Sequence, residues 1–305
     1  MTLPARATII EVGPRDGLQI EKAFVPTEAK VRLVDLLTGA GVPRVEVTSF
    51  VHPKHVPQMA DAEEVLARIQ RRPGTACEAL VPNVRGIERA LKCRVDRIVL
   101  FVAASESFNQ KNLRAGREAM LGAAREAAKL AREARLPMRG GVVTAFGCPY
   151  EGRVPLEAVE RVAGEYLEMG CEEITLADTV GVTNPASVRR MLEHLKGRFP
   201  GARFGLHFHN TRGAGLANVL AGLEAGAESF DASAGGMGGC PFAPRASGNI
   251  ATEDTVNMLH EMGIGTGIDL PQLLGAVALA ESLLGRQLPG QLLHAGIMNW
   301  DAPAA

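Results

Sequence analysis

Short apolar runs alternate along the chain with longer segments in which apolar positions recur every three or four residues. Eight such runs are spaced widely enough for one helix to fit between each pair of neighbours. Strands separated by helical patterns are typical of parallel pairing with right-handed crossovers. We expect strands at 7–12, 44–50, 76–81, 97–104, 138–146, 173–177, 203–209 and 229–234.

The segments between these runs carry the helical period. In the first, Thr27 is expected to be the N-cap, and Leu33 and Leu37 share one face. Eight strand–helix units predict an α/β fold, a closed (β/α)8 TIM barrel. A doubly wound open sheet is the alternative, but no GxGxxG motif follows the first run. Further helices are expected over 61–70, 117–135, 156–169, 185–195 and 215–225.

Two more helical patterns, 253–262 and 270–284, follow the eighth run. We expect one catalytic barrel domain over 1–305, with additional C-terminal helices from about 250 packed on it. Of the 305 residues, 46% are hydrophobic and only 4% aromatic. This composition predicts a barrel interior filled by Val, Leu, Ile and Ala.

The charges are balanced, with 33 basic and 34 acidic residues. The balance gives no reason to expect nucleic acid or a membrane as partner. The five cysteines are widely spaced and form no CxxC pair, which favours reduced thiols and a cytoplasmic location over disulfides. Neither a secretory signal nor an apolar run of membrane-spanning length is apparent.

Chemistry in such a barrel lies at the carboxyl ends of the strands. Arg15 and Asp16 follow the first run, and they also suit an ordinary turn with a solvated ion pair. Glu46 interrupts the second run. A carboxylate in a central strand is expected to face inward and to need a partner, for which Arg15 is the candidate.

His207 and His209 are two positions apart in the seventh run, so both imidazoles face the same side. This is metal-ligand geometry, although two independently satisfied polar residues would give the same pattern. Asp178 ends the sixth run, where it would face the mouth of the barrel or serve as a helix cap or turn residue.

A glycine-rich loop follows the eighth run and carries Cys240, with Asn249 a little further on. Four glycines within 235–239 permit a mobile loop, and loops of this kind close over substrates in barrel enzymes. The alternative is a tight turn that carries an incidental thiol.

Together these residues resemble the hydroxymethylglutaryl-CoA lyase family of metal-dependent TIM-barrel lyases. The similarity runs in order along nearly the whole chain. The matching segments are EVGPRDGLQ (11–19), TSFV (48–51), VPQM (56–59), GCPYEG (147–152), DT (178–179), HFH (207–209), GGCPFA (238–243), SGN (247–249) and ATED (251–254).

The resemblance implies a C–C lyase that acts on an acyl-CoA in leucine catabolism and ketone-body formation, and that works as a homo-oligomer, a dimer or tetramer. It implies Mg²⁺ or Mn²⁺ held by Asp16, His207, His209 and Asn249. Oxygen and imidazole ligands of this kind leave room for substrate oxygens in an octahedral shell. The implied catalytic residues are Arg15, Glu46, Asp178, His207 and Cys240.

The implied reaction is retro-Claisen cleavage of 3-hydroxy-3-methylglutaryl-CoA to acetyl-CoA and acetoacetate. The base that takes the hydroxyl proton is His207 or Asp178. Arg15 suits the enolate or thioester oxygen, Glu46 would orient Arg15, and Cys240 would protonate the enolate carbon.

Arg245 stands where the family commonly has glycine, and this departure puts the acyl group in question. Citramalyl-CoA or another 3-hydroxy-3-acyl-CoA is therefore an alternative substrate. A Claisen condensing enzyme similar to the isopropylmalate synthases is a second alternative. A barrel that binds metal or acyl-CoA without turnover is the third.

Overall fold

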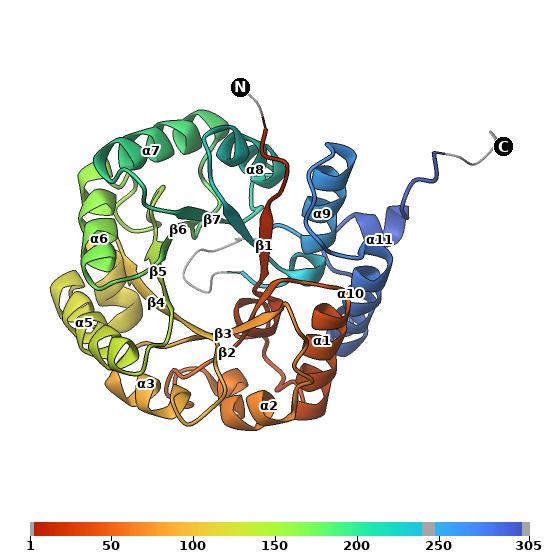
Figure 1. The fold of residues 1–305 in the computed structure, drawn as a ribbon, viewed down its shortest axis with the longest axis horizontal. Helices are drawn as coiled ribbons and strands as arrows, with labels where there is room; N and C mark the ends of the chain where they lie inside the picture. Colours follow the sequence, from red (N-terminus) through yellow and green to blue (C-terminus); the bar gives the residue numbers. More distant parts are fainter. Residues whose placement is uncertain (1–2, 240–247, 301–305) are drawn as a thin grey trace.

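The structure is a computed structural model that describes residues 3–239 and 248–300. Its centre is a closed barrel of eight parallel strands, each paired with its neighbours in chain order and β8 with β1 (Figure 1). The predicted TIM barrel is confirmed, and the open sheet is wrong. The strands are β1 (Thr8–Glu11), β2 (Arg44–Ser49), β3 (Ala76–Leu80), β4 (Arg97–Ala103), β5 (Met138–Val143), β6 (Glu173–Asp178), β7 (Phe204–Phe208) and β8 (Ser229–Ala232).

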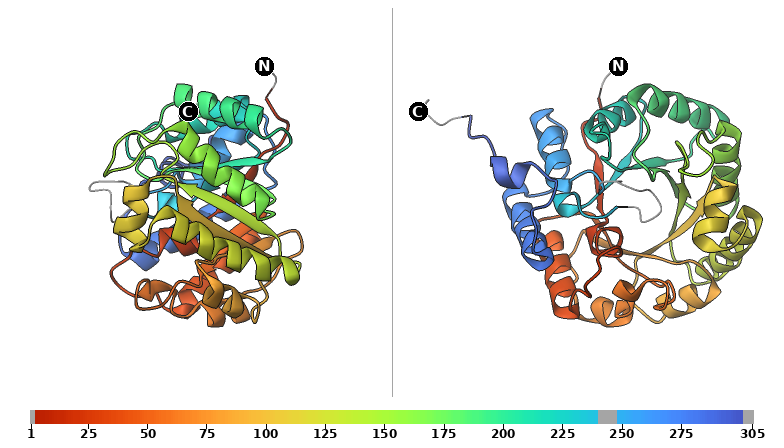
Figure 2. Two further views of the ribbon diagram at one scale, coloured as in Figure 1. Left: turned by 90° about the vertical axis from the view of Figure 1, so that its left-hand side faces the viewer. Right: turned by 180° about the vertical axis from the view of Figure 1, so that it is seen from behind.

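Helices surround the barrel, and the view from behind shows the same ring (Figure 2). The helix between β3 and β4 was not named from the sequence. It begins at a cap, where the Asn83 side chain accepts a hydrogen bond from Gly86 N. The helices are α1 (Thr27–Gly39), α2 (Ala62–Arg68), α3 (Val84–Ala90), α4 (Glu106–Phe108), α5 (Arg117–Glu133), α6 (Leu156–Glu168), α7 (Pro185–Arg198) and α8 (Gly215–Glu224).

The expected cap of α1 is wrong. Thr27 is the first helical residue, Pro26 precedes it, and the Thr27 hydroxyl donates to Asp61 rather than to the backbone of its own helix. This hydrogen bond connects the start of α1 with Asp61, which directly precedes α2. The Thr27 hydroxyl thus bonds to a side chain distant in sequence instead of capping its own helix.

Within residues 248–300 of the described chain, three helices follow the barrel: α9 (Thr252–Glu261), α10 (Leu270–Leu284) and α11 (Leu292–Ala295). They lie together on one side of the barrel, where α10 packs against α1 and α9 (Figure 1). In the part of the chain that the structure describes, no helix combines the length and the apolarity needed to cross a membrane.

The barrel interior differs from the prediction, because charged side chains occupy its centre. Arg139, on β5, is 1% exposed and contacts carboxylates from three other strands: Glu46 at 3.0 Å, Glu78 at 3.2 Å and Asp231 at 2.6 Å. Aliphatic residues instead fill the layer between strands and helices, as with Val45 on β2 and Leu37 on α1.

A second set of charges lies at the amino end of the barrel. Arg44 Nη1 contacts Glu173 at 2.7 Å, and Arg44 Nε contacts Glu78 at 2.5 Å. Since a buried charge is costly unless it is paired and hydrogen-bonded, each of these residues depends on the others. The prediction of an aliphatic interior was wrong because composition gives the number of each residue type and not the direction in which each side chain points.

We expect Arg139→Met to lower the free energy of unfolding by about 3–5 kcal/mol, because it leaves buried carboxylates without their counter-ion. The measurement is urea denaturation followed by circular dichroism. Arg125→Met is the control. Arg125 pairs with Glu165 at the surface, and its loss should cost less than about 1 kcal/mol. Equal costs for the two substitutions would contradict this account of the core.

Candidate metal centre

A tight turn, the Arg15–Asp16 turn (Gly13–Gly17), follows β1 directly. The backbone amides of Arg15, Asp16 and Gly17 all point to the carbonyl oxygen of Val12, which coils the chain at the barrel mouth. Gly17 has no room for a side chain, since a Cβ there would lie 2.9 Å from Met237 Cβ. The turn is therefore packed directly against the segment that follows β8.

Arg15 is held by two carboxylates. Its Nε donates to Glu46 at 2.5 Å, and its Nη1 donates to Asp16 at 2.6 Å. The predicted Arg15–Glu46 pair is confirmed, and Glu46 faces the barrel interior as expected. The turn is thus more than a solvated ion pair, because the Arg15 side chain is only 12% exposed.

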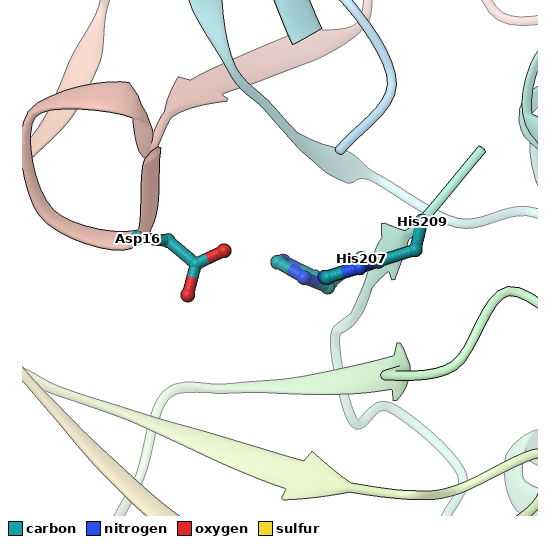
Figure 3. Close-up of side chains that lie close together, drawn as sticks. All are labelled: Asp16, His207 and His209. Carbon is teal, nitrogen blue, oxygen red and sulfur yellow. The ribbon is translucent and has the colours of Figure 1, made fainter. Parts of the chain in front are cut away.

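Asp16, His207 and His209 come together at the mouth. One potential ligand atom from each lies within 4.8 Å of the others (Figure 3). His207 lies on β7, and His209 follows its end, where it forms an isolated bridge with Asn249. Asp16 precedes the two histidines by almost two hundred positions in the sequence, yet the three side chains form one cluster. The spacing of His207 and His209 predicted only that their imidazoles share a side, and the family resemblance added Asp16.

Asn249 completes the cluster through its side-chain amide. Its Nδ2 donates to Asp16 Oδ2 at 2.9 Å and to the carbonyl oxygen of Met237 at 3.0 Å. Its Oδ1 is buried and has no hydrogen-bond partner among the described residues. A carboxylate, two imidazoles and an orphaned amide oxygen fit a divalent cation.

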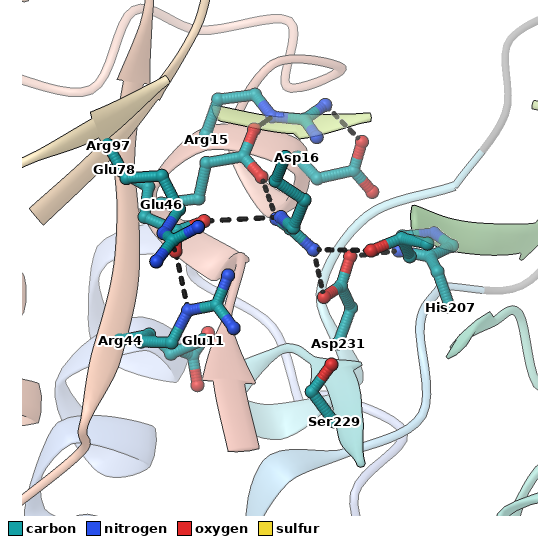
Figure 4. Close-up of polar contacts among 12 residues, drawn as sticks. Glu11, Arg15, Asp16, Arg44, Glu46, Glu78, Arg97, His207, Ser229 and Asp231 are labelled. Carbon is teal, nitrogen blue, oxygen red and sulfur yellow. Dashed lines mark hydrogen bonds and ion pairs between the residues drawn. The ribbon is translucent and has the colours of Figure 1, made fainter. Parts of the chain in front are cut away.

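His207 is oriented by a residue that the sequence analysis did not select. Its Nδ1 lies 3.2 Å from Asp231 Oδ2 (Figure 4). Asp231 Oδ1 in turn accepts from Arg139. Burial alone would raise the pKa of Asp231, but Arg139 and His207 lower it to about 2. An ionised carboxylate only accepts hydrogen bonds, so Nδ1 carries the proton and Nε2 is left for a ligand.

Arg139 links this pair to Arg15. Because Arg139 also donates to Glu46, a continuous chain of charges runs from His207 through Asp231, Arg139 and Glu46 to Arg15. His207 and Arg15, which were both expected at the mouth, are therefore positioned by one buried network.

Asp178 lies at the end of β6, next to β7. Its Oδ1 accepts from Val182 N at 3.0 Å and its Oδ2 from Thr183 N at 2.9 Å, so it shapes the turn before α7 without capping the helix. Burial raises the pKa of its carboxyl, although the two amides and His207 oppose the shift. The turn alternative is confirmed, and the carboxylate remains beside the cluster.

Cys240 and Arg245 lie outside the described residues. The other four cysteines are free thiols, of which Cys77, Cys148 and Cys171 are buried. The expected absence of disulfides holds for these four.

Two further carboxylates, Glu11 on β1 and Glu253 on α9, are completely buried. Burial raises the pKa of Glu11 to about 7 and that of Glu253 to about 8. Neither residue was predicted to have a role, although Glu11, like Glu46, is a carboxylate on a central strand.

Together the fold and the cluster define a TIM-barrel protein with a candidate site for a divalent metal at the carboxyl ends of its strands. The HMGL-like family model matches residues 6–279. This chain belongs to the HMGL-like family.

Similar proteins agree with this assignment. The chain is 45% identical over 294 residues to a hydroxymethylglutaryl-CoA lyase of Bacillus subtilis, covering 96% of this chain and 98% of that protein. A crystal structure of the Bacillus subtilis HMG-CoA lyase matches with a TM-score of 0.94 and 44% identity, over 97% of this chain and 99% of that one. An HMG-CoA lyase from Acinetobacter baumannii, in complex with coenzyme A and 3-methylmalate, matches with a TM-score of 0.93 and 42% identity over the full length of both chains.

We expect Asp231→Asn to weaken metal binding about 10- to 100-fold, because an amide no longer fixes the protonated Nδ1 of His207. Isothermal titration with Mn²⁺ measures the change. Asp269→Asn, at the exposed N-cap of α10, makes the same chemical change far from the mouth. An unchanged affinity in Asp231→Asn would show that the Asp231 contact does not prepare His207 for a ligand.

Glu253 predicts a pH dependence of stability. Burial raises its pKa to about 8 in the folded protein, from an ordinary value of 4.5, so folding favours the neutral carboxyl. The resulting stability is complete below about pH 4.5 and is lost as the pH rises towards about 8, by at most about 1.4 kcal/mol per pH unit.

Glu253→Gln removes this titration. The difference in unfolding free energy between wild type and variant should therefore shift against the wild type from about pH 5 to about pH 8. Urea denaturation at four or five pH values measures it. Parallel curves would mean that Glu253 titrates as an ordinary exposed carboxyl.

Proposed function

We propose that this protein is a divalent-metal-dependent lyase that cleaves 3-hydroxy-3-methylglutaryl-CoA to acetyl-CoA and acetoacetate. One observation carries the proposal: Asp16, His207 and His209 converge beside an arginine that two carboxylates hold in place. The relatives reported above, which are named hydroxymethylglutaryl-CoA lyases and match nearly end to end, support the choice of substrate.

Asp16, His207, His209 and Asn249 would hold the ion, and we propose Mg²⁺ or Mn²⁺ because oxygen donors make up half of the set. A divalent cation at this place would polarise substrate oxygens and lower the pKa of an alcohol. The sequence reached the same ligands only through the family resemblance, and their convergence in the structure supports it.

Arg15 supplies a permanent positive charge at the mouth. Its contacts with Glu46 and Asp16 fix the guanidinium before substrate binds, so no reorganisation is needed as negative charge develops. When the C–C bond breaks, its electron pair passes to the carbon beside the thioester and forms the enolate of acetyl-CoA. Arg15 is placed to stabilise the oxygen of that enolate.

Asp178 is the base that we propose for the hydroxyl proton of the substrate. The sequence left His207 and Asp178 as equal candidates. Nδ1 of His207 is engaged by Asp231, and its Nε2 would serve the ion, which leaves no lone pair for a proton. Asp178 is not in the ligand cluster, and burial raises the pKa of its carboxyl, which makes it a stronger base than an ordinary exposed carboxylate. Cys240 is the donor that we propose for the enolate carbon.

A cytoplasmic location and a homo-oligomeric state, a dimer or tetramer, are further parts of this proposal. Four free thiols support a reducing compartment. The expectation that neither nucleic acid nor a membrane is a partner rests on the balanced charge.

The test is to incubate the Mg²⁺-loaded protein with 3-hydroxy-3-methylglutaryl-CoA and, in parallel, with citramalyl-CoA. We expect acetyl-CoA and acetoacetate from the first substrate and no pyruvate from the second. Chelation by EDTA should abolish the reaction, and Mg²⁺ or Mn²⁺ should restore it, because substrate binding and charge stabilisation both need the cation.

Each other outcome has a distinct meaning. Pyruvate from citramalyl-CoA alone would keep the reaction class, overturn the substrate and make Arg245 the first residue to replace. Activity that survives complete metal removal would overturn the role of the cluster. No cleavage of either substrate by metal-loaded protein would favour binding without turnover.

A further inference from the structure

The chain that leaves β8 passes close to the metal cluster in a glycine-rich segment (234–239). Gly238 lies so near that a Cβ on it would be 2.8 Å from Asn249 Nδ2. The returning chain packs directly against the segment, since a Cβ on Gly248 would collide with the carbonyl oxygen of Gly236. The position of this segment therefore determines where Asn249 can lie.

Two buried carboxylates hold the start of the segment. Glu11 Oε1 accepts from Ala234 N at 3.0 Å, and Glu253 Oε2 accepts from Gly235 N at 2.9 Å. Consecutive backbone amides are thus fixed by acids from two elements, β1 and α9. Gly235 has a φ of 66°, a conformation that glycine adopts easily, so the amides need not follow a regular helix or strand.

Glu11 makes further contacts that tie the segment to its surroundings. The same Oε1 accepts from Gly13 N at 2.7 Å, at the start of the Arg15–Asp16 turn, and Oε2 accepts from the Thr252 hydroxyl at 2.6 Å. One carboxylate therefore joins the turn that carries Asp16, the segment that follows β8 and the start of α9.

The segment acts on the cluster through one hydrogen bond. The carbonyl oxygen of Met237 accepts from Asn249 Nδ2, and this bond, with the one to Asp16, turns Asn249 Oδ1 away from both acceptors. That oxygen is the buried atom without a partner among the described residues. Displacement of Met237 would turn the amide and withdraw the oxygen.

We infer that Glu11 and Glu253 are positioning residues for the metal site, and that they act through the glycine-rich segment on the orientation of Asn249. The inference rests on the metal-dependent function proposed above. It assigns to these two acids a role in forming the site, although neither is among its ligands.

The surroundings of Glu253 favour the neutral form of its carboxyl group. Burial is the main reason why its pKa is raised, and Asp254 and Glu11 raise it further. A neutral carboxyl still accepts the Gly235 amide through its carbonyl oxygen, so a glutamine should replace it in shape and in hydrogen bonding. An alanine cannot accept this hydrogen bond.

The experiment compares Mn²⁺ affinity, by titration calorimetry and by the electron paramagnetic resonance of free Mn²⁺, in paired variants. Glu11→Ala and Glu253→Ala should bind Mn²⁺ at least about tenfold more weakly, the size typical for loss of a residue that orients a ligand. Glu11→Gln and Glu253→Gln should retain the wild-type affinity within a few-fold. Glu253→Asp, which keeps the carboxyl group but shortens the side chain, should resemble the alanine variant and covers the case in which alanine does not fold.

Glu173→Ala is the control for general destabilisation. Glu173 is equally buried and accepts from Arg44 and Ser229, but it lies at the opposite, amino end of the barrel. It should lose stability, measured by urea denaturation, and keep the wild-type Mn²⁺ affinity.

Unchanged Mn²⁺ affinity in the Glu253→Ala and Glu253→Asp proteins would overturn the inference. Equal losses in Glu173→Ala would overturn it as well, because the effect would then follow stability alone. Wild-type protein that binds no Mn²⁺ would remove both this inference and the proposed function. If the variants behave as expected but the wild type cleaves no acyl-CoA, the inference stands and the proposed function fails.

Discussion

One buried cation, Arg139, constrains the centre of the barrel. Its guanidinium lies almost completely out of water and is surrounded by carboxylates from β2, β3 and β8. A charge in such a place is costly unless opposite charges surround it, so each carboxylate must come from a fixed register position. The parallel pairing of β2 with β3, which sets Glu46 beside Glu78, meets that requirement.

The same network explains why His207 in the candidate metal cluster and Arg15 have definite orientations. Asp231 orients His207, Glu46 orients Arg15, and Arg139 holds both carboxylates. Arg139 Nε and Glu78 Oε2 have no hydrogen-bond partner among the described residues and face each other only as an ion pair at 3.2 Å, while the other contacts of the network fix the orientation of its members. A rigid set of donors at the mouth suits chemistry that stabilises a developing negative charge.

The sequence predicted the eight strands, the shared side of His207 and His209 and the inward Glu46, because each leaves a local pattern. Alternating apolar runs mark strands, and two histidines two positions apart share a face. It did not give Asp231 or Arg139 a role, although each interrupts a strand in the way that Glu46 does. Arg139 and Asp231 are charged residues within central strands, like Glu46, and for the same reason both could be predicted to face the barrel interior.

The contacts of Asn249, Glu11 and Glu253 had no local pattern from which to predict them. The family resemblance alone suggested Asn249 as a ligand. The orientation of its side-chain amide depends on hydrogen bonds to Met237, twelve positions earlier, and to Asp16, in the turn after β1. Glu11 joins residues more than two hundred positions apart. Such contacts exist only once the barrel closes, which brings β1 beside β8.

The shared role of Asp231 limits how this barrel can be made more stable. Replacing a buried ion network by well-packed aliphatic residues is a common route to a more thermostable protein. Here the carboxylate that neutralises Arg139 also fixes the imidazole of His207, so an aliphatic core would leave that ring without its orienting partner. Engineering for heat resistance would have to begin in the layer between strands and helices, because a gain at the centre of this barrel would be made at the expense of its active end.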